Sequence, residues 1–328
     1  MLALCAAAGT AAFAAPRTAH GTPDALRFTH AADASAAEGL GGGLVVVAND
    51  EDNVLRVYRL PAGGAPVAAW DAGPRMALSE KSPEMDIEGS AKIGDTIYWI
   101  TSHAPNKEGK PRLNRRRFFA TRVTVTNDTP AFEVVGQPVV TLLADLDRDP
   151  RYAGFKLAAA AVRPPKTPGS LNIEALCDTP EGGLFIGFRS PVPGGKALLA
   201  PLLNPADTVN GKPPRFGDPV LLELGGNGIR AMARTDRAGF FIIAGSPLSG
   251  GGFRLYRWDG RGAPHPEETF AELPADATPE GLVAFDDGGA TALLVVSDDG
   301  ARLVDGQPAK LNPDPARRAF RGFIFRAP

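Results

Sequence analysis

Cysteine, histidine and net charge are all scarce in this 328-residue chain, which has two cysteines, four histidines and a formal charge of −2. Cys5 lies in an apolar leader, so Cys177 is the single cysteine of the remaining chain. One cysteine excludes an internal disulfide and a multi-cysteine metal site. The balance of 35 Lys and Arg against 37 Asp and Glu argues against a nucleic-acid-binding protein, which would carry a basic excess.

Long apolar runs are also missing. The N-terminal segment MLALCAAAGTAAFAAP is too short to span a bilayer, and no later stretch reaches the length of about 18 apolar residues that a transmembrane helix needs. Its Ala12-Phe13-Ala14 sequence fits the small-x-small rule for signal cleavage. We therefore expect a signal peptide at residues 1–14, a periplasmic or secreted location, and no transmembrane segment.

Glycine and proline, in contrast, are abundant, with 38 and 31 residues and no collagen-like period. Such a composition predicts many turns between short strands. Helical periodicity is nearly absent outside one Ala-rich segment, which makes a two-domain α/β protein a poor alternative. The glycine runs GGNG (225–228) and GGGF (250–253) match turns and form neither a P-loop nor a Rossmann fingerprint.

A short phrase recurs along the chain as SAAEGL, MDIEGS, LNIEAL, NGIRAM and TPEGLV. Its charged positions are spaced by 50, 86, 56 and 50 residues, and they are Glu38, Glu88, Glu174, Arg230 and Glu280. Each phrase is followed by a second apolar strand that ends in polar residues, and further strands follow. Periods of about 40 to 50 residues with several strands each are typical of β-propeller blades.

These repeats predict an all-β fold, a single β-propeller of five four-stranded blades over residues 24–328. The last unit lacks a fourth strand, and ALRFTH (25–30) is placed to supply it, so the N-terminal strand would close the ring. The long gap holds an insertion at about 141–170, with an Ala-rich helix and a Pro-rich loop. A sixth blade hidden in this gap is the alternative.

In a propeller, the start of each innermost strand and the end of the second strand lie on one face. The repeated charged residues should therefore surround one channel mouth, with Asp50 and Asp298 beside them. Clustered carboxylates raise one another's pKa unless a cation or a counter-charge intervenes. Carboxylate oxygens suit a hard cation such as Ca²⁺. The predicted metal ligands are Glu88, Glu174, Glu280, Asp50 and Asp298. The alternative is that the glutamates only tie neighbouring blades together.

Arginines supply the second predicted group of site residues. The segment NKEGKPRLNRRR (106–117) follows the second strand of the second unit, and its arginines should face the mouth. Arginine forks bind phosphate and carboxylate well. The predicted anion-binding residues are Arg115, Arg116, Arg117, Arg189 and Arg230. The alternative for the run is a solvated charged loop.

His103 is the one histidine that the repeat places at the mouth, so it is the predicted catalytic base. A packed, non-catalytic histidine is the alternative. No G-x-S-x-G nucleophile elbow is present, which argues against a serine hydrolase.

Four segments resemble the bacterial secreted domain-of-unknown-function family 3616: VVANDEDNVLRVYRL, DIEGSAKIGDTIYWITSHAPNKEGKPRLNRRRFFATRV, NIEALCDTPEGGLFIGFRSP and PEGLVAF. The resemblance extends from about residue 36 to the C-terminus and implies no activity. More distantly, the repeat is similar to esterase-like phytase and calcium-dependent lactonase propellers. That similarity implies a cation at the channel mouth and hydrolysis of phosphate esters or lactones. Arg230, in one acidic position, departs from it, and a full set of phytase calcium ligands is not matched.

Two functions follow as expectations. The first is a monomeric binding module whose mouth recognises a small anionic ligand or a cell-envelope partner. The second is a divalent-cation-dependent hydrolase of a small anionic substrate, in which the metal-bound water is the nucleophile.

Overall fold

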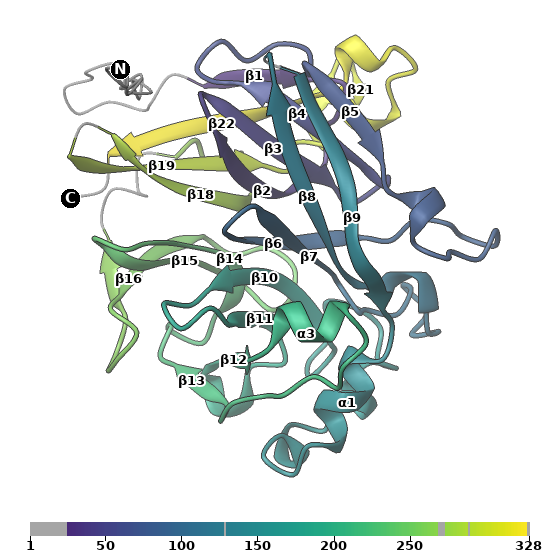
Figure 1. Ribbon diagram of the computed structural model, residues 1–328, viewed down its shortest axis with the longest axis vertical. Helices are drawn as coiled ribbons and strands as arrows, with labels where there is room; N and C mark the ends of the chain where they lie inside the picture. Colours follow the sequence, from purple (N-terminus) through teal and green to yellow (C-terminus); the bar gives the residue numbers. More distant parts are fainter. Residues whose placement is uncertain (1–24, 128, 268–272, 288, 327–328) are drawn as a thin grey trace, which may run out of the picture.

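The computed structural model describes residues 25–326 apart from 128, 268–272 and 288 (Figure 1). The predicted signal peptide at residues 1–14 lies outside the described residues. The described part forms five four-stranded antiparallel sheets, which confirms the five-bladed β-propeller. A small hairpin of β20 (Leu303–Val304) and β21 (Gln307–Pro308) is inserted between two strands of the last blade.

Each blade is an antiparallel meander, and in the first four blades the strands follow chain order from the ring axis outwards. Blade one contains β2 (Ala34–Gly41), β3 (Leu44–Asn49), β4 (Val54–Arg59) and β5 (Ala68–Asp71). Blade two contains β6 (Ile87–Ile93), β7 (Thr96–Thr101), β8 (Phe118–Thr126) and β9 (Thr129–Val139). Blade three contains β10 (Asn172–Asp178), β11 (Leu184–Ser190), β12 (Ala197–Leu202) and β13 (Val220–Leu222). Blade four contains β14 (Gly228–Thr235), β15 (Gly239–Gly245), β16 (Arg254–Trp258) and β17 (His265–Glu267). Blade five contains β18 (Pro279–Asp287), β19 (Ala290–Ser297), β22 (Ala319–Arg326) and β1 (Leu26–Thr29).

Helices are short and lie between strands. The α-helices are α1 (Leu142–Arg148), α2 (Leu157–Ala160) and α3 (Pro205–Val209). Single 3₁₀ turns are η1 (Gly73–Arg75), η2 (Leu113–Arg115), η3 (Ala153–Phe155), η4 (Pro193–Gly195), η6 (Ala309–Leu311) and η7 (Pro315–Arg317). None of the described helices has the length and apolarity needed to cross a bilayer.

The segment between β9 and β10 holds α1, η3 and α2 and no strand, so it adds no sixth blade. Its apolar side chains, including Leu142, Leu146 and Leu157, are buried in the core between blades two and three. The segment therefore extends the packing between two neighbouring blades.

Apolar side chains of successive strand residues pack in different cores, because each blade is covered on both faces. In β3, Val45 and Val47 pack against blade five, whereas Val46 packs against blade two. In β7, Trp99 faces blade one and Tyr98 faces blade three. The side-chain period of two therefore gives a continuous apolar run in the sequence of these strands, as in other strands buried on both faces.

The N-terminal strand closes the ring, as predicted. Strand β1 pairs antiparallel with β22, and Figure 1 shows the two strands side by side. Phe28 of β1 stacks on Phe320 with ring centroids 4.9 Å apart, and Tyr58 of blade one meets both rings edge-on. The two ends of the described chain are thus joined by backbone hydrogen bonds and by an aromatic cluster.

Candidate metal-binding site at the channel mouth

A β-bulge interrupts the start of every innermost strand, and the pairing register shifts there in all five blades. A bulge leaves one residue unpaired and re-aims its side chain. The residues in the bulges are Ser35, Glu88, Glu174, Arg230 and Glu280. The fold thus gathers most of the repeated charged residues at one mouth of the channel.

Glu38 is the exception, and its predicted place at this mouth is wrong. In β2 the bulge falls at Ser35, whereas Glu38 pairs with Val46 farther along the strand. The Ser35 hydroxyl donates to the Ile87 carbonyl at 2.5 Å and so links blades one and two. The repeated phrase in the sequence aligns Glu38 with the other glutamates. The hydrogen-bond register instead aligns Ser35 with them.

A glycine or alanine follows each repeated charged residue, because the innermost strands of neighbouring blades come very close together at this point. A Cβ atom on Gly89 would lie 2.8 Å from the backbone nitrogen of Leu176 in the next blade. Only glycine fits where two backbones come so close. The channel is correspondingly narrow, with a cavity of about 10 Å³ on the axis that accommodates one water-sized sphere and is lined in part by Glu88, Glu174 and Glu280.

Two of the predicted anion-binding arginines, Arg189 and Arg230, pair with carboxylates and carbonyl groups of the ring itself. Glu174 accepts from Arg189 and lies 2.9 Å from a guanidinium nitrogen of both Arg189 and Arg230. Arg230 also pairs with Glu280. The remaining Arg189 donors bind the carbonyl oxygens of Ser246 and Leu248. These two arginines therefore hold blades three, four and five together, and Glu174 is neutralised.

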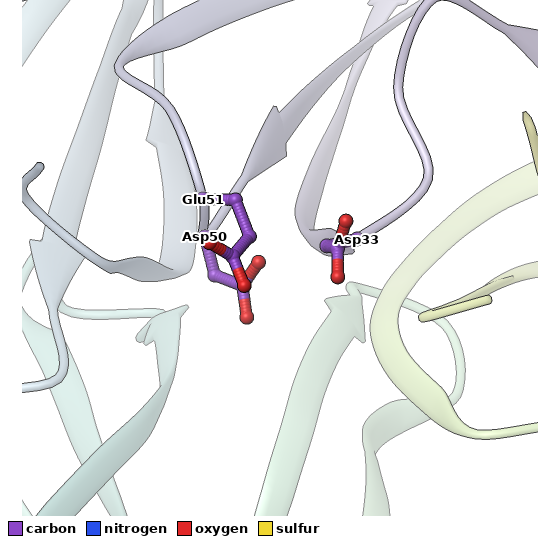
Figure 2. Close-up of side chains that lie close together, drawn as sticks. All are labelled: Asp33, Asp50 and Glu51. Atoms are coloured by element: carbon purple, nitrogen blue, oxygen red, sulfur yellow. The ribbon is translucent and has the colours of Figure 1, made fainter. Parts of the chain in front are cut away.

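Asp50 lies where three groups of carboxylates meet. In each group, one oxygen from each residue lies within 4.8 Å of the others, and the groups are Asp33–Asp50–Glu51, Asp50–Glu280–Asp298 and Asp50–Asp86–Glu88. Figure 2 shows the first group, with Asp33 facing Asp50 and Glu51. Oxygen ligands that are 2.3–2.6 Å from a common Ca²⁺ ion have this mutual spacing. The spacing and the purely oxygen donor set therefore fit a hard divalent cation.

Two carboxylates of these groups are unpaired among the described residues. One oxygen of Asp50, Oδ1, is buried and has no hydrogen-bond partner there. Glu88 is 8% exposed and makes no hydrogen bond or ion pair with any described residue. Burial raises the pKa of both side chains, and neighbouring Asp86 raises both further. A buried carboxylate without a counter-charge is costly, so these two side chains are the ones a cation would stabilise most.

The three carboxylate groups differ in how much positive charge lies beside them. Lys310 Nζ lies 3.5 Å from Asp33 Oδ1 and also pairs with Glu51, so the first group already has a cation. Within the described residues, the Asp298 carboxylate accepts one hydrogen bond, from the backbone nitrogen of Gly300. The strongest demand for a positive charge is therefore between Asp50, Glu88 and Asp298.

The three predicted anion-binding arginines of the 106–117 segment lie in different surroundings. Arg115 faces the mouth and lies 2.9 Å from Glu84 and 3.0 Å from Asp86. Arg117 is buried and donates to four backbone carbonyls, so it supports the loop. Arg116 is half-buried, and its Nε has no hydrogen-bond partner among the described residues. Of these three, Arg115 is the arginine that the structure joins to the carboxylates.

His103 is fully buried beside the mouth, where its Nδ1 lies 2.8 Å from the Thr101 carbonyl oxygen. Its Nε2 is buried and has no partner among the described residues. Burial lowers the pKa of His103 to about 4, and Arg116 and Arg117 add to the effect. The neighbouring Ser102, in contrast, hydrogen-bonds to Asp86. His103 is thus neutral near pH 7, and no contact joins it to the clustered carboxylates in the described structure.

Asp33, Glu51 and Asp86 belong to the groups but are not among the predicted metal ligands. Asp33 and Asp86 each lie two residues before a bulge residue, Asp33 before Ser35 and Asp86 before Glu88. Asp86 lies inside the repeated phrase MDIEGS and Glu51 follows Asp50 directly, whereas Asp33 is aligned with Asp86 only when the first repeat is aligned on Ser35. Burial raises the pKa of Asp33 to about 7, and Asp298 adds to it while Lys310 opposes it.

No family model matches the chain, and no curated protein matches its sequence. Among solved structures, the chain is similar to glutaminyl cyclase from Myxococcus xanthus (14% identity, 92% of this chain and 95% of that chain, TM-score 0.44). It is also similar to the Malassezia sympodialis allergen Mala s 1 (8% identity, 94% and 96%, TM-score 0.43). A gluconolactonase from Xanthomonas campestris is a third (14% identity, 96% and 96%, TM-score 0.41). What the protein binds is therefore inferred from the geometry of the site.

Proposed function

We propose that the channel mouth binds a divalent cation, with Ca²⁺ the best match, through Asp50, Glu88, Glu280 and Asp298, and that the occupied mouth captures a small anionic ligand. The observation that carries the proposal is the position of Asp50, which belongs to all three carboxylate groups while its Oδ1 has no partner in the described part of the protein. Glu174 is left out of the predicted ligand set because two arginines pair with it and it belongs to none of the three carboxylate groups. Glu280 pairs with Arg230 alone and belongs to the group of Asp50 and Asp298, so it is kept.

Electrostatics supports the same assignment. Burial and mutual repulsion disfavour the ionised forms of Asp50 and Glu88, whereas a divalent cation favours them. Metal binding would therefore release protons and stabilise the folded ring. Arg115 and Lys310 are both partly exposed at the rim and pair with Asp86 and Asp33, so a ligand's anionic group can approach these two cations.

Hydrolysis of an anionic ester or lactone is the second candidate function, and Asp33 favours it. A divalent cation, when bound, supplies a water of lowered pKa. Asp33 belongs to the Asp50 group and has a pKa raised to about 7, a value suited to a general base near neutral pH. In this proposal Asp33 takes the role predicted for His103, because His103 contacts none of the carboxylates among the described residues.

The location and the partners are part of the proposal. A periplasmic or secreted location, predicted from residues 1–14, fits extracellular Ca²⁺ sites, which are typically of low affinity. A monomer that takes a small anionic ligand or a cell-envelope partner is the corresponding assembly, with no nucleic acid involved.

Thermal unfolding with EDTA and then with Ca²⁺, Mg²⁺ or Mn²⁺ tests the cation site. A ligand that binds only the folded state raises Tm according to RT ln(1 + [L]/Kd). We expect Ca²⁺ to raise Tm of the wild type and of Glu80→Gln, whose side chain is exposed and unpaired among the described residues, but not of Asp50→Asn. Equal shifts in Asp50→Asn, or no shift with any cation, would contradict the proposal.

Turnover of a panel of phosphate esters and lactones tests the second function. Activity should disappear with EDTA and with Asp50→Asn and should fall in Asp33→Asn, while Glu80→Gln keeps it. Activity that survives EDTA would exclude the cation-dependent mechanism. A calcium shift without turnover would leave the binding function standing and remove the hydrolase.

A further inference from the structure

A second pocket opens over blade four, at the same end of the ring as the carboxylate groups. Ala244 pairs with both Ile229 and Arg254, so the starts of β14 and β16 lie at the mouth end of the blade. The pocket has a volume of about 350 Å³, within the range of small-molecule sites. Its lining residues are Gly225, Asn227, Gly252, Phe253, Arg254 and Tyr256.

Tyr256 presents its hydroxyl to this pocket. The residue is 5% exposed, its hydroxyl oxygen is not one of the fully buried atoms, and it makes no hydrogen bond with any described residue. Buried tyrosines ordinarily place the hydroxyl on a partner. A Cβ atom on Gly225 would lie 3.6 Å from this oxygen, so the glycine keeps the space before the hydroxyl open. The hydroxyl is therefore available to a ligand.

Two further polar groups reach the same space. Arg254 is exposed, and its guanidinium forms no ion pair or hydrogen bond within the described part of the chain. Asn227 donates from Nδ2 to the Leu224 carbonyl, which leaves Oδ1 as an acceptor for a ligand hydroxyl. An arginine fork, a phenol and an amide oxygen together match an anionic group and neighbouring hydroxyls on one small molecule.

Phe253 forms the wall between this pocket and the charged ring. Its ring centroid lies 5.7 Å from Cζ of Arg230, which pairs with Glu174 and Glu280. A Cβ atom on Gly245 would lie 2.9 Å from the Phe253 ring, so this wall is closely packed. The other side of the half-buried phenyl ring offers the pocket an apolar surface.

We propose that this pocket binds a sugar-sized polyol ring that bears one carboxylate or phosphate. The anionic group binds Arg254, hydroxyls bind Tyr256 and Asn227, and the apolar face of the ring packs on Phe253. This ligand would be the small anionic ligand of the proposed function, and only that identification rests on the proposed function. Binding at the pocket uses none of the carboxylates around Asp50, so it does not require the cation.

Isothermal titration in EDTA tests the pocket with four probes: glucuronate, glucose 6-phosphate, glucose and inorganic phosphate. We expect both anionic sugars to bind at least about tenfold more tightly than glucose, because a charged hydrogen bond is stronger than a neutral one. Arg254→Gln should remove that preference and leave glucose unchanged. Tyr256→Phe should weaken all three sugars, and Arg75→Gln, an exposed arginine in η1, should change nothing.

Three results would overturn the proposal. These are no binding of either anionic sugar, equal binding in Arg254→Gln, and inorganic phosphate binding as tightly as glucose 6-phosphate, which would indicate a simple anion site. Asp50→Asn separates the two proposals, because sugar binding in EDTA should persist in this variant while its calcium response is lost. Near-ultraviolet circular dichroism of each variant verifies that the fold is retained.

Discussion

Arg230 of blade four is paired with Glu174 of blade three, with Nη1 2.9 Å from Oε2. The same guanidinium pairs with Glu280 of blade five, so one buried cation links three innermost strands. Removal of one partner of a buried ion pair typically costs about 3–5 kcal/mol, because a charge is left uncompensated. We expect Arg230→Met to lower the free energy of unfolding by that amount in urea titrations with EDTA. Arg75→Met, at an exposed position, is the control.

Calcium should compensate for part of this loss. Without Arg230, the carboxylates of Glu174 and Glu280 face Asp50 and Glu88 with less positive charge nearby. A cation at the mouth then stabilises the fold more than it does in the wild type. The rise in Tm on addition of Ca²⁺ should be larger in Arg230→Met than in the wild type. A smaller rise would mean that Arg230 does not offset the negative charge at the mouth.

Asp50→Asn and Glu174→Gln should have opposite effects in EDTA. Asp50 is repelled by Asp298 and Asp86, so a neutral amide should raise the free energy of unfolding by about 1 kcal/mol. Glu174 neutralises two arginines, so its amide variant should lose about 3 kcal/mol or more. Urea unfolding of both variants in the same buffer gives the comparison, and destabilisation by Asp50→Asn would show that Asp50 is a structural tie.

Ring closure depends on Phe28, which is fully buried between Tyr58 and Phe320. Phe28→Ala should cost about 3–5 kcal/mol, the usual range for deleting a core aromatic ring. Tyr58→Phe removes only the hydroxyl that donates to the Thr29 carbonyl at 2.9 Å, so about 1 kcal/mol is expected. Equal costs for the two variants in chemical denaturation would mean that the rings contribute little to closure.

Much of the fold could be predicted because propeller strands have a strong sequence pattern. The apolar run at Val45–Val47 reflects burial on both faces of blade one, and the polar residue at its end marks the mouth. The closing role of residues 25–30 followed from the missing strand of the last repeat. These features are local in sequence and repeat in every blade.

The site was only partly predictable, because its details depend on register and on long-range pairing. Glu38 matches the repeated letters, yet the bulge in β2 falls at Ser35, three residues earlier. Nothing local in the sequence shows that Arg117 turns inward to backbone carbonyls while Arg115 reaches Asp86. The pairing of Glu174 with both Arg189 and Arg230 likewise requires three strands to be placed in space.

His103→Asn tests whether His103 acts in the site or only packs beside it. His103 has φ of 55°, a left-handed conformation that asparagine tolerates. Its folded pKa of about 4 lies below the ordinary value of 6.5, so its contribution to stability is complete above pH 6.5 and is lost as pH falls towards 4. The advantage of the wild type over His103→Asn in unfolding free energy should therefore shrink on acidification. Calcium binding at pH 7.5 should be equal in both proteins. Loss of calcium binding in the variant would show that His103 takes part in the cation site.

Glu38 should give the opposite dependence on pH. Burial, with repulsion from Asp178, raises its pKa from 4.5 to about 8, and Lys92 opposes the change. A carboxyl group that holds its proton more tightly in the folded state stabilises the fold fully below pH 4.5, and this contribution is lost as pH rises through 8. Glu38→Gln does not titrate in that range. The difference in unfolding free energy, wild type minus Glu38→Gln, should thus fall by about 1–3 kcal/mol between pH 4.5 and 8.5. Each unit of pKa shift corresponds to about 1.4 kcal/mol, and the partial exposure of Glu38 reduces the effect.

Glu80→Gln, which alters an exposed carboxylate, should show no such trend and is the matched control. A constant difference between the wild type and Glu38→Gln across this range would mean that water reaches Glu38 freely from the far end of the channel. A difference that rises with pH would mean that Glu38 is ionised in the folded state and held by Lys92. Because Glu38 lies away from Asp50 in β2, the pH profile in EDTA distinguishes titration inside the channel from titration at the cation site.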